Sequence, residues 1–473
     1  MTLTLRTFRR ILVTAVVLAA AVVQSGCAVG PNYERPDVAT PVRYKEAPAE
    51  TAAPAAPPDA WWSLFNDPTL NDLEAQVDVS NQNLAAAQAA YAQALTVIQE
   101  QRATLFPAIT LDANASHTSG PASNSTARNT RGPDSYLAGA GASWEIDLWG
   151  RLRRSLENAH ALADASAADL ASARLSIQGQ LAIAYLQLRE ADAEQRLVAE
   201  TAQAYARSSQ ITQNRYAAGV AAKTDVLQAQ TQLANAQDQA TALQLQRSQL
   251  EHAIAALIGK PASDFTLPTE TGWSIAVPDI PSGVPSTLVQ RRPDIIAAER
   301  RVAAASAAIG VQEAAYFPSL TLTGSYDFVS SSIGALFSAA SVTRSIAASV
   351  SQTLFNAGAT KARVAGARAA YDQSVAEYRQ NVLTAFQDVE DQLASSRLLA
   401  QQYDLRNQAT AAADESERLT MNQYRAGSVS YTNVVVAQTA ALTARRALAS
   451  IAVEQQTTAV SLITALGGGW NGT

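Results

Sequence analysis

The sequence predicts a chain that combines very long α-helices with amphipathic transmembrane β-strands, in two tandem copies. Three observations lead to this fold class: an internal repeat with a period near 210 residues, long helical segments without proline, and strand-like stretches in which apolar and polar side chains alternate. The period is far longer than that of a solenoid, so it indicates two structural halves rather than a stacked array.

The internal repeat is visible at two places in each half. Ala103–Leu111 matches Ala314–Leu322 at an offset of 211 residues, and Arg215–Gly219 matches Gln423–Gly427 at an offset of 208 residues. We therefore expect residues 67–275 to form a first structural repeat and residues 276–467 a second, followed by a tail at 468–473.

Both repeats are expected to contain the same elements in the same order. A helix leads into a β-hairpin, a very long helix follows the hairpin, and a shorter helix returns alongside it. In the first repeat we expect a helix from Asp67 to Leu105, a hairpin at 108–148, and helices at 151–217 and 223–258. In the second repeat we expect a helix at 286–315, a hairpin at 319–355, and helices at 361–425 and 432–466.

The long helices carry a seven-residue repeat, which is typical of a left-handed superhelical seam. The helix that leads into the hairpin and the returning helix together match the long helix in length, so we expect them to lie end to end beside it. Within 151–217 the residues at the seven-residue spacing are Leu156, Ala163, Leu170, Ile177, Ala184, Ala191, Val198 and Tyr205.

The predicted strands each have an apolar face and a polar face. Leu111 and Ile146 are assigned to the apolar face, and Thr110 and Ser143 to the polar face. The apolar faces have the pattern of strands that contact lipid.

Four such strands cannot close a barrel. In lipid their free edges would leave backbone groups without hydrogen bonds, at a cost of several kcal/mol for each group. We therefore expect the chain to pool strands with copies of itself, as a dimer of eight strands, a trimer of twelve or a tetramer of sixteen. Trp144 and Trp149 are expected at the membrane boundary.

The composition limits the classes of function. Hydrophobic residues make up 48% of the chain but aromatic residues only 6%, which favours close helix–helix contacts over a compact globular core. The net charge of −6 and the lack of a dense Lys/Arg run argue against nucleic acid as a partner. The single cysteine excludes internal disulfides.

No motif predicts chemistry. His117, His160 and His252 are far apart in the sequence and lack the spacing of a metal site. Gly259-Lys260-Pro261 lacks the spacing of a phosphate loop, and we interpret Gly259 as the end of a helix. The chain is therefore expected not to be an enzyme and to need no cofactor.

The first residues have the pattern of an export signal. Arginines at 6, 9 and 10 precede the apolar run Ile11–Val23, and the small residues Ser25-Gly26 precede the single cysteine, Cys27. This arrangement resembles a bacterial lipoprotein signal, which predicts cleavage of residues 1–26 and a covalent lipid on Cys27. The alternative is an ordinary secretory signal with an incidental cysteine.

Several motifs, in this order, resemble the TolC-like outer membrane factor family, in particular its lipoprotein, NodT-type branch. They are Cys27–Pro36, Trp61–Pro68, Arg291–Arg301 and Ala315–Leu322. The resemblance runs from the cysteine to the end of the second repeat. It implies a homotrimer in which a twelve-stranded β-barrel, four strands from each chain, continues into a twelve-helix periplasmic α-barrel. Residues 27–66 would be a lipid-anchored extended segment that joins an equatorial layer around the tunnel.

The resemblance also implies a function, partners and a location. The family conducts drugs or other exported compounds outward, coupled to a periplasmic adaptor protein and an inner-membrane pump, here expected to be of the resistance-nodulation-division type. It places the chain in the outer membrane, with a lipid anchor at Cys27 and a tunnel that extends into the periplasm.

The same resemblance assigns a gate to the two turns that join the long helices to the returning helices. Thr224, Asp225 and Tyr424 fall on family gating positions, whereas Asn433 and Val436 stand where the family usually has acids. We expect Tyr424 to donate a hydrogen bond to Asp225 across a helix contact.

Two glycines and two alternatives complete the predictions for the turns. Gly219 and Gly427 are expected to allow the tight turns, so that adjoining residues meet the adaptor. Alternatively, Thr224 or Asp225 simply caps the returning helix.

For the whole chain, two alternatives to a channel remain. One is a lipid-tethered coiled-coil scaffold without a pore, which would have no use for lipid-facing hairpins, and the other is a periplasmic enzyme.

Overall fold

The computed structural model describes residues 28–47, 60–117, 134–270, 277–278, 280 and 285–469. The chain divides into two compact units. The first unit comprises Met1–Asp37, Ala90–Ala167 and Ala297–Arg379, and it contains the β-sheet. The second unit comprises Val38–Ala89, Ala168–Ile296 and Gln380–Thr473, and it contains the returning helices. The expected signal at 1–26 and Cys27 lie outside the described residues.

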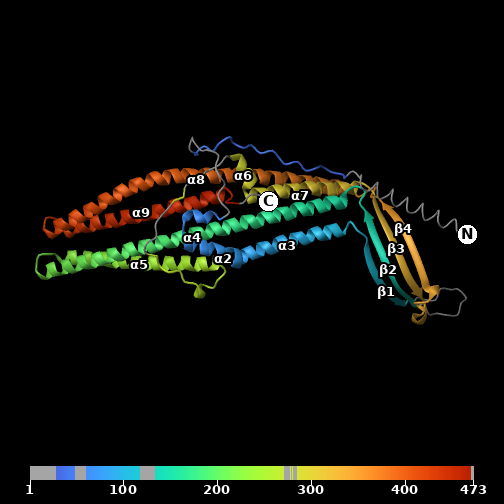
Figure 1. Ribbon diagram of the computed structural model, residues 1–473, viewed down its shortest axis with the longest axis horizontal. Helices are drawn as coiled ribbons and strands as arrows, with labels where there is room; N and C mark the ends of the chain where they lie inside the picture. The colour runs from blue at the N-terminus through green and yellow to red at the C-terminus, as the bar shows by residue number, and fades with distance from the viewer. Residues whose placement is uncertain are drawn as a thin grey trace. The chain divides into compact units, whose positions relative to one another are not determined.

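The elements follow the repeat (Figure 1). The long helices α4 and α8 each have 67 residues, and the returning helices α5 and α9 each have 35, so the two halves agree in length. The helices are α2 Pro68–Ser80, α3 Gln82–Ala103, α4 Arg151–Ala217, α5 Lys223–Leu257, α6 Pro285–Arg291, α7 Pro293–Glu313, α8 Ala359–Arg425 and α9 Tyr431–Ala465. The strands are β1 Ala108–His117, β2 Asp134–Ile146, β3 Ser319–Ser330 and β4 Val342–Ser351.

The helix expected from Asp67 to Leu105 is two helices, so that prediction was wrong. Asn81 has extended backbone angles between α2 and α3. Its Oδ1 accepts a hydrogen bond from the backbone N–H of Leu84, and its Nδ2 donates one to the carbonyl of Leu257, at 2.9 Å and 2.7 Å. One side chain thus starts α3 and fastens it to the end of α5.

The second repeat contains the equivalent break, and the helix expected at 286–315 is also two helices. Pro293 has no N–H for a continuous helix, so α6 ends at Arg291 and α7 begins at the proline. Arg292 donates from Nη1 to the carbonyl of Ala465 at 3.3 Å. Arg292 stands 211 residues after Asn81, and Ala465 stands 208 residues after Leu257. In both repeats the same contact, made by different side chains, therefore joins the end of the returning helix to the start of the helix that leads into the hairpin.

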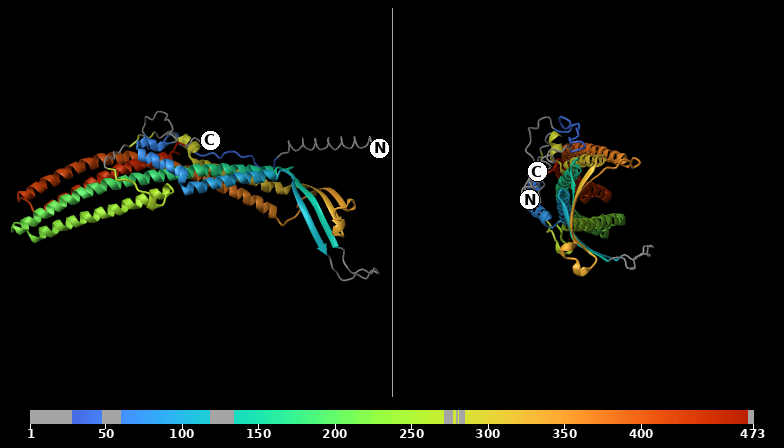
Figure 2. Two further views of the ribbon diagram at one scale, coloured as in Figure 1. Left: turned by 60° about the horizontal axis from the view of Figure 1, so that its bottom comes forward. Right: turned by 90° about the vertical axis from the view of Figure 1, so that its right-hand side faces the viewer.

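The strands form one antiparallel sheet in the order β1-β2-β3-β4 (Figure 2). Residues directly opposite each other share a face of the sheet. Leu111 pairs with Ala140, and Ala140 pairs with Tyr326, so the apolar positions of successive strands fall on one face. Thr110 and Gly141 pair on the other face. The two predicted faces are confirmed, although the hairpin expected at 319–355 ends at Ser351.

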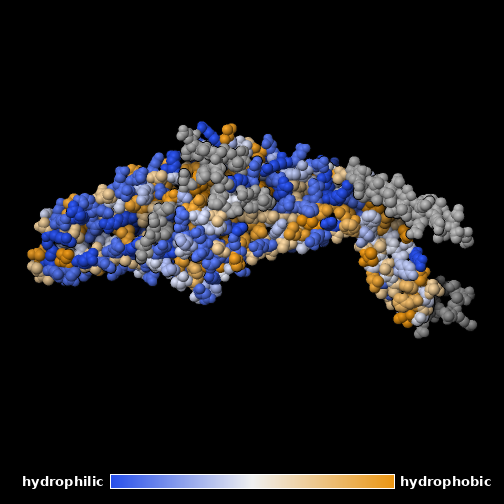
Figure 3. All heavy atoms as spheres, viewed as in Figure 1, coloured by the Kyte–Doolittle hydropathy of each residue, from blue (hydrophilic) through white to orange (hydrophobic). Residues whose placement is uncertain are grey.

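The apolar face of the sheet is open. Leu111 is 88% exposed and Ile346 is 94% exposed, and orange atoms gather over the strands on the side seen in Figure 3. Within the described chain, β1 and β4 are each paired on one side only. The sheet therefore has an uncovered apolar face and two unpaired edges.

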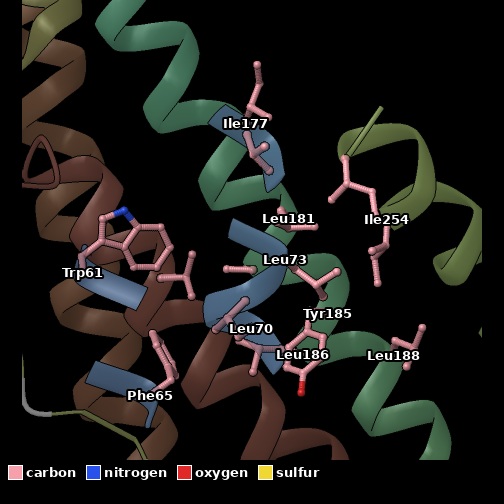
Figure 4. Close-up of a cluster of buried hydrophobic side chains, with 14 of the residues drawn as sticks. Trp61, Phe65, Leu70, Leu73, Ile177, Leu181, Tyr185, Leu186, Leu188 and Ile254 are labelled. Carbon is pink, nitrogen blue, oxygen red and sulfur yellow. The ribbon is translucent and has the colours of Figure 1, made fainter. Parts of the chain in front are cut away.

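The core of the second unit collects side chains from segments far apart in the sequence (Figure 4). The short helix η1, Trp61–Phe65, and α2 bring residues that precede the first hairpin against α4 and α5. Burying each large apolar side chain contributes roughly 1.5–3 kcal/mol. The labelled members are Trp61, Phe65, Leu70, Leu73, Ile177, Leu181, Tyr185, Leu186, Leu188 and Ile254.

A buried ionic network ties the segment after α5 to the helices of this core. Asp192 accepts hydrogen bonds from Arg189 at 3.0 Å and from Arg247 at 2.7 Å. The two arginines also donate to the carbonyls of Pro268 and Leu267, respectively. Glu270 lies 3.5 Å from Arg189 and Glu251 lies 3.3 Å from Arg247, so each guanidinium has a second carboxylate besides the shared Asp192 and the buried charges are compensated.

Helices α4, α5, α8 and α9 all end in the same hydrogen-bonded motif. The glycine N–H bonds to the carbonyl three residues earlier, and the next N–H bonds to the carbonyl five residues before it. The expected helix end at Gly259 is thereby confirmed. The four glycines have positive φ and are Gly219, Gly259, Gly427 and Gly467.

Replacing two of these glycines by alanine separates backbone strain from a packing contact. A Cβ at Gly259 would lie 2.1 Å from the carbonyl oxygen of Ser80, whereas a Cβ at Gly219 meets nothing within 4 Å. Both variants incur roughly 1–2 kcal/mol for the left-handed conformation. Gly259→Ala should lower the free energy of unfolding by about 1–3 kcal/mol more than Gly219→Ala, because its Cβ overlaps the Ser80 carbonyl. Thermal dissociation midpoints of the two purified variants measure the difference, and equal midpoints would refute the Ser80 contact.

The register predicts that the two faces of the sheet respond differently to charge. Leu111→Asp places a carboxylate on the open apolar face and should reduce the amount of protein assembled in the membrane. Thr110→Asp, one residue away on the polar face, is the matched control and should have a milder effect. The measurement is the yield of assembled protein extracted from membranes, and equal yields for both variants would contradict the assigned faces.

Candidate functional site: the helical turns

Two tight turns carry the residues predicted to form a gate, and both lie in the second unit. The first turn joins α4 to α5 and the second joins α8 to α9. Gly219 and Gly427 occupy equivalent places, with φ of 74° and 79°. No atom lies within 4 Å of a Cβ built on either glycine, so it is the backbone conformation that calls for glycine.

The second turn is packed against the first repeat. Tyr424 and Tyr431 contact edge to face, with ring centroids 5.2 Å apart. Both rings are buried in a cluster with Val434 and with Ala229 of α5. The guanidinium of Arg215 lies over the Tyr424 ring, 4.9 Å from its centroid. The end of α8 and the start of α9 are thus held by contacts within the same chain.

Two buried hydroxyl contacts fix these rings to α4. The Tyr431 hydroxyl lies 3.1 Å from Ser208 Oγ. The Thr212 hydroxyl donates to the Ser208 carbonyl, so the Tyr424 hydroxyl, 3.4 Å from Thr212 Oγ1, is the donor in that contact. Tyr424 was predicted to donate to Asp225, and the structure instead gives Thr212 as its acceptor. Asp225 lies on α5, whereas the acceptor found is on α4.

The Tyr431 hydroxyl is in an unfavourable place for ionisation. Burial raises its pKa, the hydrogen bond with Ser208 opposes that rise, and the nearby Asp225 carboxylate adds to it. Tyr431 therefore stays neutral at physiological pH and remains a hydrogen-bonding group. The Asp225 carboxylate of α5 is thus close enough to the second turn to raise the pKa of Tyr431.

The first turn makes the equivalent contact with different residues. Tyr216 and Lys223 stand 208 residues before Tyr424 and Tyr431. The Lys223 ammonium lies 5.3 Å from the Tyr216 ring centroid. Tyr216 is 40% exposed, whereas Tyr424 is 3% exposed. The duplication therefore kept the pairing across the turn but left the first turn open to solvent.

The remaining predicted residues lie on the outer surface of the turns. Thr224 and Asn433 are exposed, Val436 is 65% exposed, and Asp225 is half-buried. The cap of α5 is Ala222, without a side-chain hydrogen bond, so neither Thr224 nor Asp225 is the helix cap. Asp225 lies in the first turn of α5, where a negative charge is stabilised by the helix dipole.

Sequence reasoning missed Ser208, Thr212, Arg215 and Tyr431. A signal for Thr212 was present, because it stands seven residues after Tyr205 in the predicted seam of α4. Above the turns, the buried positions of that seam follow alternating spacings of three and four: Ala191, Glu194, Val198, Thr201, Tyr205, Ser208 and Thr212. Ser208 and Arg215 share that signal, because they stand three residues after Tyr205 and Thr212. Tyr431 had no such signal, because it begins the returning helix of the other repeat.

The first unit holds a second feature of interest, the segment that follows Cys27. The backbone N–H of Val29 donates to the carbonyl of Trp149 at 2.9 Å. Arg154 is buried and donates to the carbonyls of Val29 and Gly30 and to Asn32 Oδ1. Residues 28–32 are thus bound at the start of α4, next to the sheet.

The two tryptophans expected at the membrane boundary lie where strands meet helices. Trp144 donates from Nε1 to the carbonyl of Leu105, and Trp149 donates from Nε1 to the carbonyl of Pro318, at 2.9 Å and 2.8 Å. Trp149 also stacks on Phe317 with ring centroids 4.7 Å apart. Each indole N–H is satisfied by protein, which leaves the apolar rings at the end of the sheet.

No described helix is both long enough and apolar enough to cross a bilayer. Within the same residues, no three His, Cys, Asp or Glu side chains gather as a metal site requires.

Comparisons with known proteins agree with this architecture. The family model for "Outer membrane efflux protein" matches residues 74–260 and again 284–468, once for each repeat. The probable efflux pump outer membrane protein TtgC of Pseudomonas putida is 32% identical over 457 residues, covering 95% of this chain and 94% of that protein. Outer membrane protein OprJ of Pseudomonas aeruginosa is 28% identical over 456 residues, covering 96% and 95%.

Solved channels have the same fold. The outer-membrane channel OprN is 31% identical, with a TM-score of 0.86 and coverage of 94% of this chain and 100% of that chain. The open state of the Neisseria gonorrhoeae MtrE outer membrane channel is 28% identical, with a TM-score of 0.82 and coverage of 94% and 99%. The predicted fold class is confirmed: the chain is the subunit of a trimeric channel in which a twelve-stranded β-barrel, four strands from each chain, continues into a barrel of long helices. The chain belongs to the outer membrane efflux protein family.

Proposed function

We propose that the trimer is the outer-membrane channel of a tripartite efflux system, which conducts exported compounds from an inner-membrane pump and a periplasmic adaptor to the exterior. The observation that carries this proposal is the sheet, with its open apolar face and two unpaired edges, in the same chain as paired long helices. A lipid-tethered scaffold would have no use for such a sheet. Transport through a tunnel also requires neither a catalytic group nor a cofactor.

The cargo and the partners follow from this proposal only as classes. Relatives are named for the efflux of antibiotics and of toluene and for the export of pyoverdine. Channels of one fold thus serve chemically different compounds, and the pump selects the cargo. We assign the pump to the resistance-nodulation-division type, with the adaptor contacting the residues next to Gly219 and Gly427.

The turns are the proposed gate. Three copies of Asp225 around a trimer axis would form a ring of carboxylates, and such a ring favours cations. Asn433, which is equivalent to Asp225 on α9, and Val436 three residues after it carry no charge. Because the second turn is held by Tyr424 and Tyr431 within its own chain, opening the ring would require α8 and α9 to move with those contacts or to break them.

A lipid on Cys27 is the proposed anchor. Support comes from residues 28–32, which Arg154 and the Trp149 carbonyl hold beside the sheet. A chain fixed there starts at the level where strands meet helices, which suits an acyl group that must enter the membrane.

Planar-bilayer recordings of the purified trimer test both the channel and the gate. Asp225→Asn should lower the cation-to-anion permeability ratio because it removes the proposed ring of charges, while Asp238→Asn on the same helix should not. Tyr424→Phe should raise the resting conductance modestly, since one hydrogen bond contributes roughly 0.5–1.5 kcal/mol.

Two results would count against these assignments. A correctly assembled trimer that carries no current in any variant would rule out the channel. Unchanged selectivity in Asp225→Asn, with current present, would place the gate elsewhere.

The anchor is tested by the mass of the mature N-terminus from the native host. The wild-type chain should begin at Cys27 with a mass increase for the attached acyl groups, and Cys27→Ser should lose that increase. Assembly should partly survive in the variant, because the sheet inserts independently of the anchor. An unmodified Cys27 in the wild-type protein would eliminate the proposed lipid.

A further inference from the structure

One cation interrupts the apolar face of the sheet. Arg344 is the only Lys or Arg in the four described strands. The register pairs it with Tyr326, which places it on the same face as Leu111 and Ala140. Its neighbours on that face of β4 are Val342 and Ile346, and Ile346 is 94% exposed. An uncompensated guanidinium in such surroundings is costly to place in lipid.

The guanidinium is held in place but not neutralised by the described part of the chain. Its carbon lies 5.1 Å from the Tyr326 ring centroid, and no described carboxylate lies within ion-pair distance of it. A cation over an aromatic face leaves the N–H donors at its edge free to bind an anion. The arrangement therefore presents five donors along an otherwise apolar surface.

A neighbouring subunit would not supply the missing carboxylate on this face. When three sheets close into a barrel, the free edge of β4 comes next to β1 of another copy. On the same face, β1 carries Ile109, Leu111, Ala113, Ala115 and His117. Among the described residues of that face, Asp134 lies one strand further away, on β2, where His117 contacts it at 2.6 Å. The described positions of β1 on this face therefore offer Arg344 no carboxylate.

The position along the strand indicates the depth in the membrane. Arg344 is the third residue of β4, at the end of the sheet remote from the helices. Tyr326, Phe328 and Phe337 form a chain of edge-to-face contacts at this end, and Trp144 and Trp149 lie at the other end. Aromatic residues at both ends of an apolar band mark the two levels of lipid head groups. Arg344 is thus close to the head groups of the outer leaflet.

We propose that Arg344, held against Tyr326, binds the phosphate of an anionic lipid in the outer leaflet. Arginine forms bidentate, charge-assisted hydrogen bonds with phosphate. Such a lipid would neutralise the Arg344 cation on the apolar face of each described sheet. The proposal rests on the outer-membrane location and the closed barrel of the proposed function, but it does not depend on conduction.

The test is lipid binding to the purified, delipidated trimer, measured by native mass spectrometry with bisphosphorylated lipid A as the probe. Arg344→Gln should weaken binding about tenfold, which corresponds to the loss of one charge-assisted pair. Arg344→Lys should restore part of the affinity, because the charge remains without the bidentate geometry. The matched control is Arg363→Gln, which removes an exposed arginine of α8 outside the sheet.

Three outcomes would overturn the proposal. Equal binding of lipid A by the wild type and Arg344→Gln would show that Arg344 is not the site. Equal binding of dephosphorylated lipid A by the wild type would exclude the phosphate as the recognised group. A lower trimer yield of Arg344→Gln without any lipid would make Arg344 a subunit contact. Conductance of the same variant is recorded separately, so failure of the lipid site and failure of the channel are distinguishable.

Discussion

The unpaired edges of a four-stranded sheet are the constraint on which the rest of the molecule depends. Within the described chain, β1 and β4 each have a partner on one side only, and in lipid every free backbone group costs several kcal/mol. Closure with two other copies removes all the edges at once. The alternation of side chains then follows, because a closed barrel must show an apolar face to lipid and a polar face to the lumen.

The duplication supplies both the strands and the helices by repeating one unit. α4 and α8 have the same length, as do α5 and α9, so the helices of the two halves match in length. Equivalent contacts are made by unlike residues: Asn81 and Arg292 each bind the end of the returning helix of their own repeat, through the carbonyls of Leu257 and Ala465. The geometry of the contact was therefore retained while its chemistry diverged.

The turns, which are the proposed gate, show the same divergence. The pair Tyr424 and Tyr431 is buried and bound to α4, whereas Tyr216 and Lys223 face solvent. Pseudo-equivalent turns therefore differ in how firmly they are held. An opening that moves one turn more than the other needs this kind of asymmetry, because a symmetric pair would respond equally.

The sequence by itself determined the repeat, the long helices and the two faces of the strands. These features depend on the local periodicity of apolar and polar residues, because the position of a residue in a helix or strand sets the side to which its side chain points. It also contained the break at Pro293, which the predicted helix at 286–315 ignored. Only the tertiary structure decided the break at Asn81 and the acceptor of Tyr424, because Leu257 and Thr212 are distant in the chain and are brought near by packing. The spacing of residue types along the sequence does not indicate which distant residues come into contact.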